Sequence, residues 1–442
     1  LCGGGNGTHV AAGALARQGV RVNIFTRRAA AFQKDMLLDL PDGRTVAGRI
    51  NEISDDPAEV IPDSDMVMIF APVHVYQSIL FDIAPHLRPR AAVGTMFCQA
   101  HTDLMVHSLV PAALEVTAFG TTYIPWQAKV IADGKHGHMV GAKSELNLAV
   151  RGASPHIPDR FQEISELFAG WFGMRVHRVP YLATALPTSN QLLHPAIYAT
   201  RFPDWDGKSP VAAGDYGPGS LYTGMTAASA ERLEQLEGEL IHTKVALLAR
   251  FPHLDLSSVK PIRTRIREQY DDGADYSSMQ TTFNTATWYG KSKFAMRPVD
   301  GGVAPDLGHR HFHDDIPFGL VCLRDIAGQL GVATPYMDAS IEWHQRVWGR
   351  EYLTPEGLVG RNMEGTGVLS RYGVTLDQYG RDQFHARAHR GPSALRRRQA
   401  SHGLRPGRLP LEGRRGAPRH VGRGRGGNAA PRFPPHGGDP RA

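Results

Sequence analysis

Two segments in the second half of the chain concentrate side chains that could transfer protons or bind a charged substrate. The first contains Asn190 and His194, which are four residues apart. On a helix these two side chains share one face and can point into the same cleft. Because histidine titrates near neutral pH, we interpret His194 as a candidate general acid and base, with a purely structural histidine as the alternative.

The second segment, residues 309–315, holds three histidines, one arginine and two aspartates directly before an apolar stretch. We interpret Arg310 as a clamp for a substrate carboxylate, and Asp315 as the partner that orients a catalytic histidine and raises its pKa. The alternative is a solvated loop in which Asp314 or Asp315 caps the next helix. In an extended chain the histidines and Asp315 would share one face and could imitate a metal site. No cysteine or distant carboxylate completes that set, so we expect no metal.

A glycine-rich turn at the start of the chain predicts nucleotide binding. Gly3 allows a tight turn, and Gly5 lets the backbone approach a pyrophosphate that sits on the N-terminus of the next helix. The third small position of this pattern falls on Thr8 instead of Gly or Ala. Since Leu1 stands directly before the turn, we expect most of the first strand to be missing from the sequence. The predicted cofactor-binding residues of the turn are Gly3, Gly5, Asn6, Gly7 and Thr8.

The residues after the second predicted strand, 20–25, bear on which dinucleotide binds. An acidic residue there would bind the ribose 2′-hydroxyl of NAD, but this chain has Arg27 and Arg28. Two guanidinium groups could hold the 2′-phosphate of NADP, so we expect NADP(H) at least as readily as NAD(H). The alternative is that both arginines are solvated loop charges.

The predicted secondary structure changes near residue 180, from alternating strands and helices to mostly helices. Strands at 20–25, 64–73, 91–97, 115–119 and 138–141 alternate with helical stretches, which predicts a doubly wound Rossmann-like sheet over residues 1–180. Residues 181–383 show long helical periods, including 227–248 and 336–348, and predict a mostly α-helical catalytic domain. The expected fold class is therefore α/β, with the substrate domain at 181–383.

Charge is distributed unevenly along the chain. Residues 384–442 contain 14 arginines, no lysine and two acidic residues, a balance of +12, whereas the whole chain carries +6. Subtracting the two leaves −6 for residues 1–383, so the body shows no basic footprint for nucleic acid. We interpret 384–442 as a disordered segment that is out of frame or foreign to the fold. The alternative is a basic arm that binds polyanions.

Composition also excludes some classes of protein. No stretch approaches the ~20 apolar residues of a membrane-spanning helix, and no signal segment opens the sequence, so we expect a soluble cytoplasmic protein with no membrane partner. Three widely separated cysteines in apolar surroundings predict buried, reduced thiols. They are Cys2, Cys98 and Cys322.

The motifs together resemble the opine dehydrogenases, most closely the octopine dehydrogenase type. The resemblance covers residues 1–379 and is carried by motifs at residues 3–7, 190–198, 204–207 and 310–320. It implies the condensation of a 2-oxo acid, usually pyruvate, with the amino group of an amino acid, followed by reduction of the imine with NADH or NADPH. Small-molecule substrates are therefore the expected partners, and we expect a monomer or a homodimer.

The resemblance also assigns roles to individual residues. It makes His194 the acid/base catalyst, Asp315 its dyad partner, Asn190 a helper in the cleft and Arg310 the carboxylate clamp. It further implies that Gln99 and Thr122 face the substrate from the nucleotide-binding domain.

Two other functions fit the same two-domain plan. A reductase of a hydroxy acid or sugar phosphate would typically use a lysine base, for which Lys291 and Lys293 are the candidates. A non-catalytic NAD(P)-sensing protein would keep the glycine turn but would need no pair of His194 with Asp315.

Overall fold

The computed structural model describes residues 1–383 except 188, 218, 271–272, 288–289 and 291. The predictions made for the basic segment 384–442 and for Lys291 therefore concern residues outside the described part of the chain.

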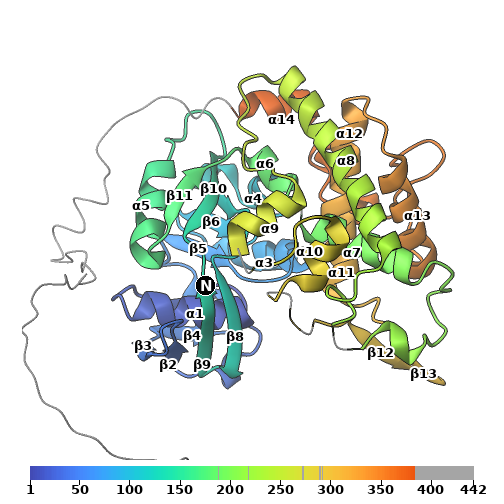
Figure 1. The fold of residues 1–442 in the computed structure, drawn as a ribbon. Coiled ribbons are helices and arrows are strands. Elements are labelled where there is room, and N and C mark those ends of the chain that lie inside the picture. Colours follow the sequence, from blue (N-terminus) through green and yellow to red (C-terminus); the bar gives the residue numbers. More distant parts are fainter. Residues whose placement is uncertain (188, 218, 271–272, 288–289, 291, 384–442) are drawn as a thin grey trace, which may run out of the picture. The chain divides into compact units, whose positions relative to one another are not determined.

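The first half of the chain is built on a sheet whose strands run parallel except where β10 meets β7 (Figure 1). The sheet has two parts: β4 pairs with β1, and five further strands follow the order β5-β6-β7-β10-β11. The predicted Rossmann-like plan is thus present. The strands are β1 (Asn23–Phe25), β4 (Glu52–Ser54), β5 (Met66–Ile69), β6 (Ala92–Thr95), β7 (Thr117–Thr121), β10 (Glu145–Gly152) and β11 (Arg175–Arg178).

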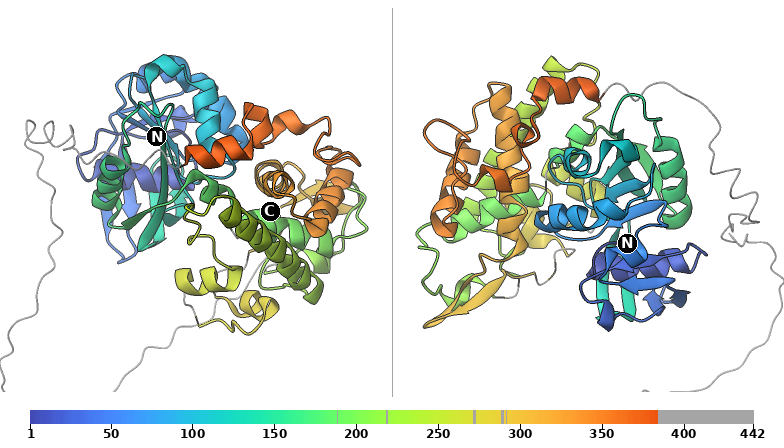
Figure 2. Two further views of the ribbon diagram at one scale, coloured as in Figure 1. Left: turned by 90° about the horizontal axis from the view of Figure 1, so that it is seen from above. Right: turned by 180° about the vertical axis from the view of Figure 1, so that it is seen from behind.

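The first residues of the chain join the two parts of this sheet. Cys2 forms parallel bridges with Phe25 of β1 and with Ile69 of β5. Its backbone N–H donates to Met68 and its carbonyl accepts from Phe70. Both views in Figure 2 show the N-terminus among these blue and teal strands. The glycine turn therefore begins at the carboxyl end of a central strand, where open α/β sheets bind ligands.

A second sheet, of order β3-β2-β9-β8, covers the outer face of the first helix. Its strands are β2 (Asp35–Asp39), β3 (Thr45–Arg49), β8 (Trp126–Ala132) and β9 (His136–Ala142), and the helix is α1 (Asn6–Ala16). The strand predicted at 138–141 is present but belongs to this second sheet. Helix α1 begins at Asn6, directly after the glycine turn, and is buried on all sides over residues 8–15. Small residues there allow close packing; a side chain at Gly13, for example, would collide with Leu38.

Four helices accompany the strands in this half of the chain, namely α2 (Pro57–Val60), α3 (Tyr76–Ile83), α4 (Thr102–Leu109) and α5 (Phe161–Phe172). The three cysteines are buried free thiols, as predicted. Within the described ranges, no helix combines the length and the apolar character needed to cross a bilayer.

The second half of the chain is mostly helical, as predicted. Its helices are α6 (Tyr181–Ala185), α7 (Asn190–Arg201), α8 (Ala227–Arg250), α9 (Ile262–Tyr270), α10 (Met279–Thr285), α11 (Arg310–His313), α12 (Val321–Gln329), α13 (Pro335–Trp348) and α14 (Leu376–Asp382). A hairpin of β12 (Met296–Val299) and β13 (Gly302–Pro305) interrupts them. Short 3₁₀ turns lie at Ala29–Ala31, Val73–Val75, Ala84–His86, Ala112–Leu114, Ala213–Asp215, Met363–Gly365 and Leu369–Tyr372.

The long helix α8 organises this half, as Figure 1 shows. Thr226 caps its N-terminus by accepting a hydrogen bond from the backbone N–H of Ser229. Four leucines at helical spacing, Leu233, Leu236, Leu240 and Leu247, are buried. The face they form packs against α7, α10, α12 and α13. This packing fixes α7, which carries His194, against the rest of the helical core.

Candidate active site

His194 and Asp315 form a hydrogen-bonded pair in the interior of the molecule. Nδ1 of His194 lies 2.7 Å from Oδ2 of Asp315, and neither side chain is more than 1% exposed. As a carboxylate, Asp315 only accepts, so the Nδ1–H of His194 donates to it. The neutral ring then carries its lone pair on Nε2. A histidine held in this tautomer is ready to act as a base at Nε2.

Two further aromatic residues contact His194: Tyr222, which the sequence did not indicate, and His311, which it indicated only as part of a histidine-rich segment. The hydroxyl of Tyr222 lies 2.7 Å from Nε2 of His194. On its face, His194 stacks against the ring of His311, with centroids 3.6 Å apart. His311 is itself held by Tyr198, whose hydroxyl lies 3.2 Å from Nδ1 of His311. The His194 ring is therefore fixed at both nitrogens and on one face.

Burial controls the charge of His194. Desolvation lowers its pKa, the hydrogen bond and charge of Asp315 oppose this, and the positive charge of Arg310 lowers it further. As expected from the sequence, Asp315 acts to raise the pKa of His194, but burial outweighs this influence and the pKa is lowered. The neighbouring imidazoles are affected in the same direction: burial lowers the pKa of both His309 and His311. His194 is thus a neutral base at pH 7.

The segment around Asp315 is helical, not extended. Residues 310–313 form α11, and a π-helical turn, Ile316–Leu320, follows directly after Asp315. Helical spacing turns the histidines of this segment toward different neighbours: His311 meets His194, whereas His313 lies against His74 and Trp348. Across the described residues, no group of three or more histidine, cysteine or acidic side chains is arranged to hold a metal. The histidines and Asp315 could share one face only in an extended chain. The expectation of an extended chain was wrong, because this segment is helical.

Gln99, from the loop after β6, lies beside the carboxylate of Asp315. Its Nε2 donates long hydrogen bonds to Asp315 Oδ1 at 3.4 Å and to Gln191 Oε1 at 3.5 Å. Gly319 in the π-helical turn makes room for this approach, because a side chain there would meet both Gln99 and Gln191. The Oε1 of Gln99 is buried and has no hydrogen-bond partner among the described residues. A buried acceptor without a partner is costly, and a ligand donor would satisfy it.

Thr122 directly follows β7, the strand next to β6. Its backbone N–H donates to Asn147, and its hydroxyl is buried without a hydrogen-bond partner in the described part of the chain. Since β6 and β7 are parallel, Gln99 and Thr122 follow carboxyl ends at the same edge of the sheet. This is the edge where the fold places ligands.

Asn190 and Arg310 lie at the starts of two helices that also carry the buried groups. Asn190 is the first residue of α7, one turn before His194, and is partly buried. Arg310 opens α11 and is exposed, yet its charge influences the pKa of His194. Among the described residues, Arg310 has no carboxylate partner in an ion pair. A cation placed near the dyad in this way is available to a substrate carboxylate.

A second histidine–aspartate pair stands beside the first. Oδ1 of Asp314 accepts from the backbone N–H of His74 at 3.0 Å and from its ring Nδ1 at 2.6 Å. His74 lies in the 3₁₀ turn after β5, Val73–Val75, so this pair joins the nucleotide-binding half to the segment that carries Asp315. The two alternatives of a helix cap at Asp314 or Asp315 are not realised: both carboxylates bind histidines.

The glycine turn has the shape that a dinucleotide requires. Gly3 has φ +129° and a side chain there would collide with the carbonyl of Phe70. Gly5 is exposed, and a side chain at this position would meet no atom of the described residues within 4 Å. The space beside Gly5 is therefore open to a ligand at the start of α1, an 11-residue helix whose first N–H groups favour a pyrophosphate. The residues present thus fit the cofactor.

Most of the other predicted cofactor-binding residues also make contacts within the protein. Asn6 accepts the backbone N–H of Val130 at 3.0 Å, which ties β8 to the turn. Gly7 leaves space for the ring of Phe70, and Thr8 is buried. Arg28 donates to the carbonyl of Gly4 and forms an ion pair with Asp133 at 2.8 Å. Arg27 is exposed and makes no ion pair with any described residue.

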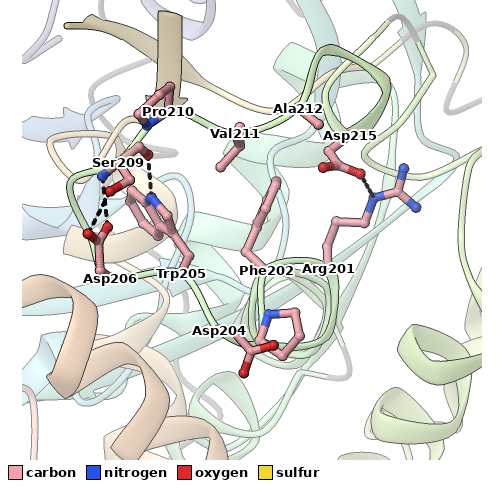
Figure 3. Close-up of a pocket in the computed structure, with 11 residues that line it drawn as sticks. Arg201, Phe202, Asp204, Trp205, Asp206, Ser209, Pro210, Val211, Ala212 and Asp215 are labelled. Carbon is pink, nitrogen blue, oxygen red and sulfur yellow. Dashed lines mark hydrogen bonds and ion pairs between the residues drawn. The ribbon is translucent and has the colours of Figure 1, made fainter. Parts of the chain in front are cut away.

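A surface pocket of about 420 Å³ is lined in part by Arg201, the last residue of α7 (Figure 3). It is lined by residues 201–206, 209–212 and 215. Asp206 accepts the backbone N–H groups of Lys208 and Ser209, and the indole of Trp205 donates to the Ser209 carbonyl. The motif at 204–207 therefore builds a turn in which Trp205 and Asp206 hydrogen-bond to the protein itself. Lys293, the alternative lysine base, is exposed on another segment.

Known dehydrogenases resemble this chain in sequence. Residues 178–348 match the family model described as NAD/NADP octopine/nopaline dehydrogenase, alpha-helical domain. The chain is 29% identical to octopine dehydrogenase of Pecten maximus over 395 residues, which covers 85% of this chain and 97% of that protein. It is 28% identical to tauropine dehydrogenase of Arabella iricolor over 399 residues, covering 85% and 98%.

Solved structures of octopine dehydrogenase also resemble this chain. A structure of octopine dehydrogenase in complex with NADH and agmatine superposes with a TM-score of 0.73 at 26% identity and covers 89% of this chain and 98% of that one. A structure of the same enzyme with NADH and L-arginine gives a TM-score of 0.73 at 27% identity with the same coverage. The resemblance noted in the sequence is confirmed: the chain carries the octopine/nopaline dehydrogenase alpha-helical domain at residues 178–348 and is similar to opine dehydrogenases over most of its length.

Proposed function

We propose that this protein condenses pyruvate, or another 2-oxo acid, with the amino group of an amino acid and reduces the resulting imine to a secondary amine dicarboxylate. The observation that carries the proposal is the buried pair of His194 and Asp315, placed next to Gln99 from the ligand-binding edge of the sheet. Relatives named octopine, opine and tauropine dehydrogenase support the same reaction class.

The proposed roles follow from the geometry. His194 is the acid/base catalyst because its neutral Nε2 can accept a proton, and Asp315 fixes its tautomer and stabilises the imidazolium. Arg310 holds a substrate carboxylate. Gln99 and Thr122 present buried polar groups to the substrate from the sheet edge, and Asn190 lies one turn before His194 in the same cleft.

The nicotinamide cofactor supplies the hydride for the reduction. In the proposed site the pyrophosphate lies against Gly3 and Gly5 at the start of α1, with Asn6, Gly7 and Thr8 shaping the turn. Arg27, which is exposed after β1, together with Arg28 supports binding of NADPH at least as well as NADH. A solved octopine dehydrogenase binds NADH, and a solved yersinopine dehydrogenase of the same fold binds NADP⁺.

The same proposal extends to the organisation of the chain. Residues 1–180 form the nucleotide-binding domain, 181–383 the substrate domain, and 384–442 a segment foreign to the fold. We propose a monomer or homodimer in the cytoplasm, where buried cysteines such as the three in this chain stay reduced.

An assay of cofactor oxidation tests the function against its alternatives. We expect oxidation of NADH or NADPH when pyruvate is supplied together with one member of an amino acid panel, and very little with pyruvate alone. Equal oxidation with the 2-oxo acid alone would identify a hydroxy-acid dehydrogenase instead. Cofactor binding without turnover on any pair would identify a sensing protein.

A further inference from the structure

Tyr222 occupies the position from which a proton would reach the catalytic histidine. Its hydroxyl lies 2.7 Å from Nε2 of His194, on the side of the ring opposite the bond to Asp315. The other two neighbours of the ring do not compete for this nitrogen: His311 stacks on the ring face, and Asp315 binds Nδ1.

The direction of the hydrogen bond follows from the tautomer. Because Nδ1–H of His194 donates to a carboxylate, Nε2 of the neutral ring is an acceptor, and the hydroxyl of Tyr222 donates to it. The chain Tyr222–His194–Asp315 is thus a continuous donor series of two 2.7 Å bonds. The reactive nitrogen of His194 meets a tyrosine oxygen, not open solvent.

Packing holds Tyr222 in this place. It belongs to the loop just before the cap of α8, and the N–H of Met225 donates to its carbonyl at 3.1 Å. Its ring stacks on Phe283 of α10, with centroids 6.4 Å apart and planes inclined by 29°, and on the ring of His194 at 5.9 Å and 27°. The side chain is only partly buried, whereas His194 is fully buried. Tyr222 therefore connects a buried base to a more accessible surface.

We propose that Tyr222 is a further catalytic residue, whose hydroxyl carries protons between the substrate and Nε2 of His194. This inference rests on the proposed condensation of an amine with a 2-oxo acid. The incoming ammonium gives one proton to the Tyr222 oxygen while the hydroxyl proton of Tyr222 moves to Nε2. The imidazolium formed is stabilised by Asp315.

The return of that proton completes the condensation. The free amine attacks the keto carbon, a C–N bond forms, and a second nitrogen proton moves to the former keto oxygen. When the C–O bond breaks, the proton on Nε2 returns through Tyr222 to the departing hydroxyl, which leaves as water. The nitrogen has then lost two protons, both in the water, the iminium keeps the positive charge, and the enzyme regains its starting protonation state.

The first test is independent of turnover. In the wild type, the hydroxyl of Tyr222 donates to Nε2 and so stabilises the neutral form of His194. Tyr222→Phe keeps the ring and its stacking but removes this hydrogen bond. We expect the pKa of His194, followed by NMR of its ring in the full chain, to rise in Tyr222→Phe. The other charged or titratable groups around the ring, Asp315, Arg310, His311 and His309, are unchanged by the substitution. An unchanged pKa of His194 would overturn the proposal.

The second test uses the active amine and 2-oxo acid pair. We expect kcat to fall on the order of 10- to 100-fold with a KM for the 2-oxo acid near that of the wild type. A proton inventory measures kcat as a function of the deuterium content of the solvent. The plot should be curved for the wild type, in which two protons move together, and linear for Tyr222→Phe, in which one proton moves. Wild-type or faster turnover in Tyr222→Phe would mean that Tyr222 merely covers the histidine.

A control variant separates the hydroxyl from general effects of the substitution. Tyr216→Phe makes the same change six residues earlier, at a partly buried tyrosine packed against the same core. It should leave both the pKa of His194 and kcat unchanged. If the wild type turns over no substrate pair, the proposed function fails by that result alone, and the NMR comparison still decides whether Tyr222 controls Nε2 of His194.

Discussion

Asp314 binds His74 through one carboxylate oxygen, which accepts both the backbone N–H and the ring Nδ1–H of that histidine. The next residue, Asp315, binds His194. Two adjacent carboxylates therefore hold histidines from different halves of the chain, one after β5 and one on α7. The position of Asp315, the proposed catalytic carboxylate, is thereby linked to the half of the chain that holds the glycine turn.

We predict that Asp314→Asn weakens this link without removing the dyad. The loss of a charge-assisted hydrogen bond should lower the free energy of unfolding by about 1–2 kcal/mol, as measured by urea denaturation. Because Asp315 then loses a fixed neighbour, kcat should fall about three- to tenfold. Asp377→Asn is the matched control: Asp377 pairs with Arg250 on the surface, so its free energy of unfolding should stay close to that of the wild type. Equal effects of the two variants would contradict a special role for Asp314.

For His194, the proposed acid/base catalyst, we predict that His194→Ala lowers kcat on the order of 100-fold or more. Cofactor binding, measured by quenching of protein fluorescence, should stay close to that of the wild type because the glycine turn is untouched. The companion variant His311→Phe keeps a ring stacked on His194 and should retain far more activity. Near-normal turnover in His194→Ala would refute the assignment of the base.

The fold could be predicted from the sequence where strands, turns and long helices leave strong local patterns. Alternation of strands with helices gave the parallel sheet, and leucine spacing located α8 within two residues of its observed end. The second sheet was not predicted. Its strands come from residues 35–49 and 126–142, and no local pattern signals that such distant segments pair. For the same reason the burial of α1 on all sides could not be read from its own residues.

The site was predicted less completely than the fold. His194 and Asp315 stood out because polar groups among apolar residues are unusual, and their pairing over 121 residues came from the family resemblance. Tyr222 and His74 lie in segments with no such contrast, so only tertiary packing brings them to the site. His311 was noticed, but only as a member of a histidine-rich segment, since its stacking on His194 depends on the helical turn at 310–313.

Replacement of the two arginines after β1 tests the cofactor preference. We predict that the wild type binds NADPH at least as well as NADH, and that Arg27→Asp combined with Arg28→Ser shifts the preference toward NADH. Because Arg28 already binds Gly4 and Asp133, the single variant Arg27→Asp should produce most of the change. Dissociation constants for both cofactors decide this. A wild type that strongly prefers NADH would mean that Arg27 is only a surface charge.

Acid should destabilise the protein through buried neutral histidines. Burial lowers the pKa of His101 and of His344 to about 4, well below the ordinary value of 6.5. Between pH 6.5 and 4 the unfolded chain binds protons that these residues in the folded protein do not, so stability falls as the pH falls. At pH 5 the loss should be about 2 kcal/mol for each residue relative to pH 7.5.

Denaturation in urea at the two pH values measures this loss. His101 has no hydrogen-bond partner among the described residues and packs edge-on against Tyr379, so His101→Phe keeps an aromatic contact. That variant should lose about 2 kcal/mol less than the wild type on acidification. Identical pH dependence in the two proteins would show that His101 is not the group responsible.

Truncation after Gln383 tests whether the basic segment 384–442 contributes to the fold. Such a truncation keeps the hydrogen bonds that hold the last described residues to the rest of the protein. Tyr379 donates to the buried Asp103 at 2.8 Å, and Gln383 accepts from the backbone N–H of Tyr181 at 2.8 Å. We therefore predict equal thermal stability and equal turnover for residues 1–383 and the full chain. Salt dependence should differ, because 14 arginines attract polyanions and their removal should abolish binding to heparin at low ionic strength. A clear loss of melting temperature or kcat on truncation would instead make residues 384–442 a working part of the enzyme.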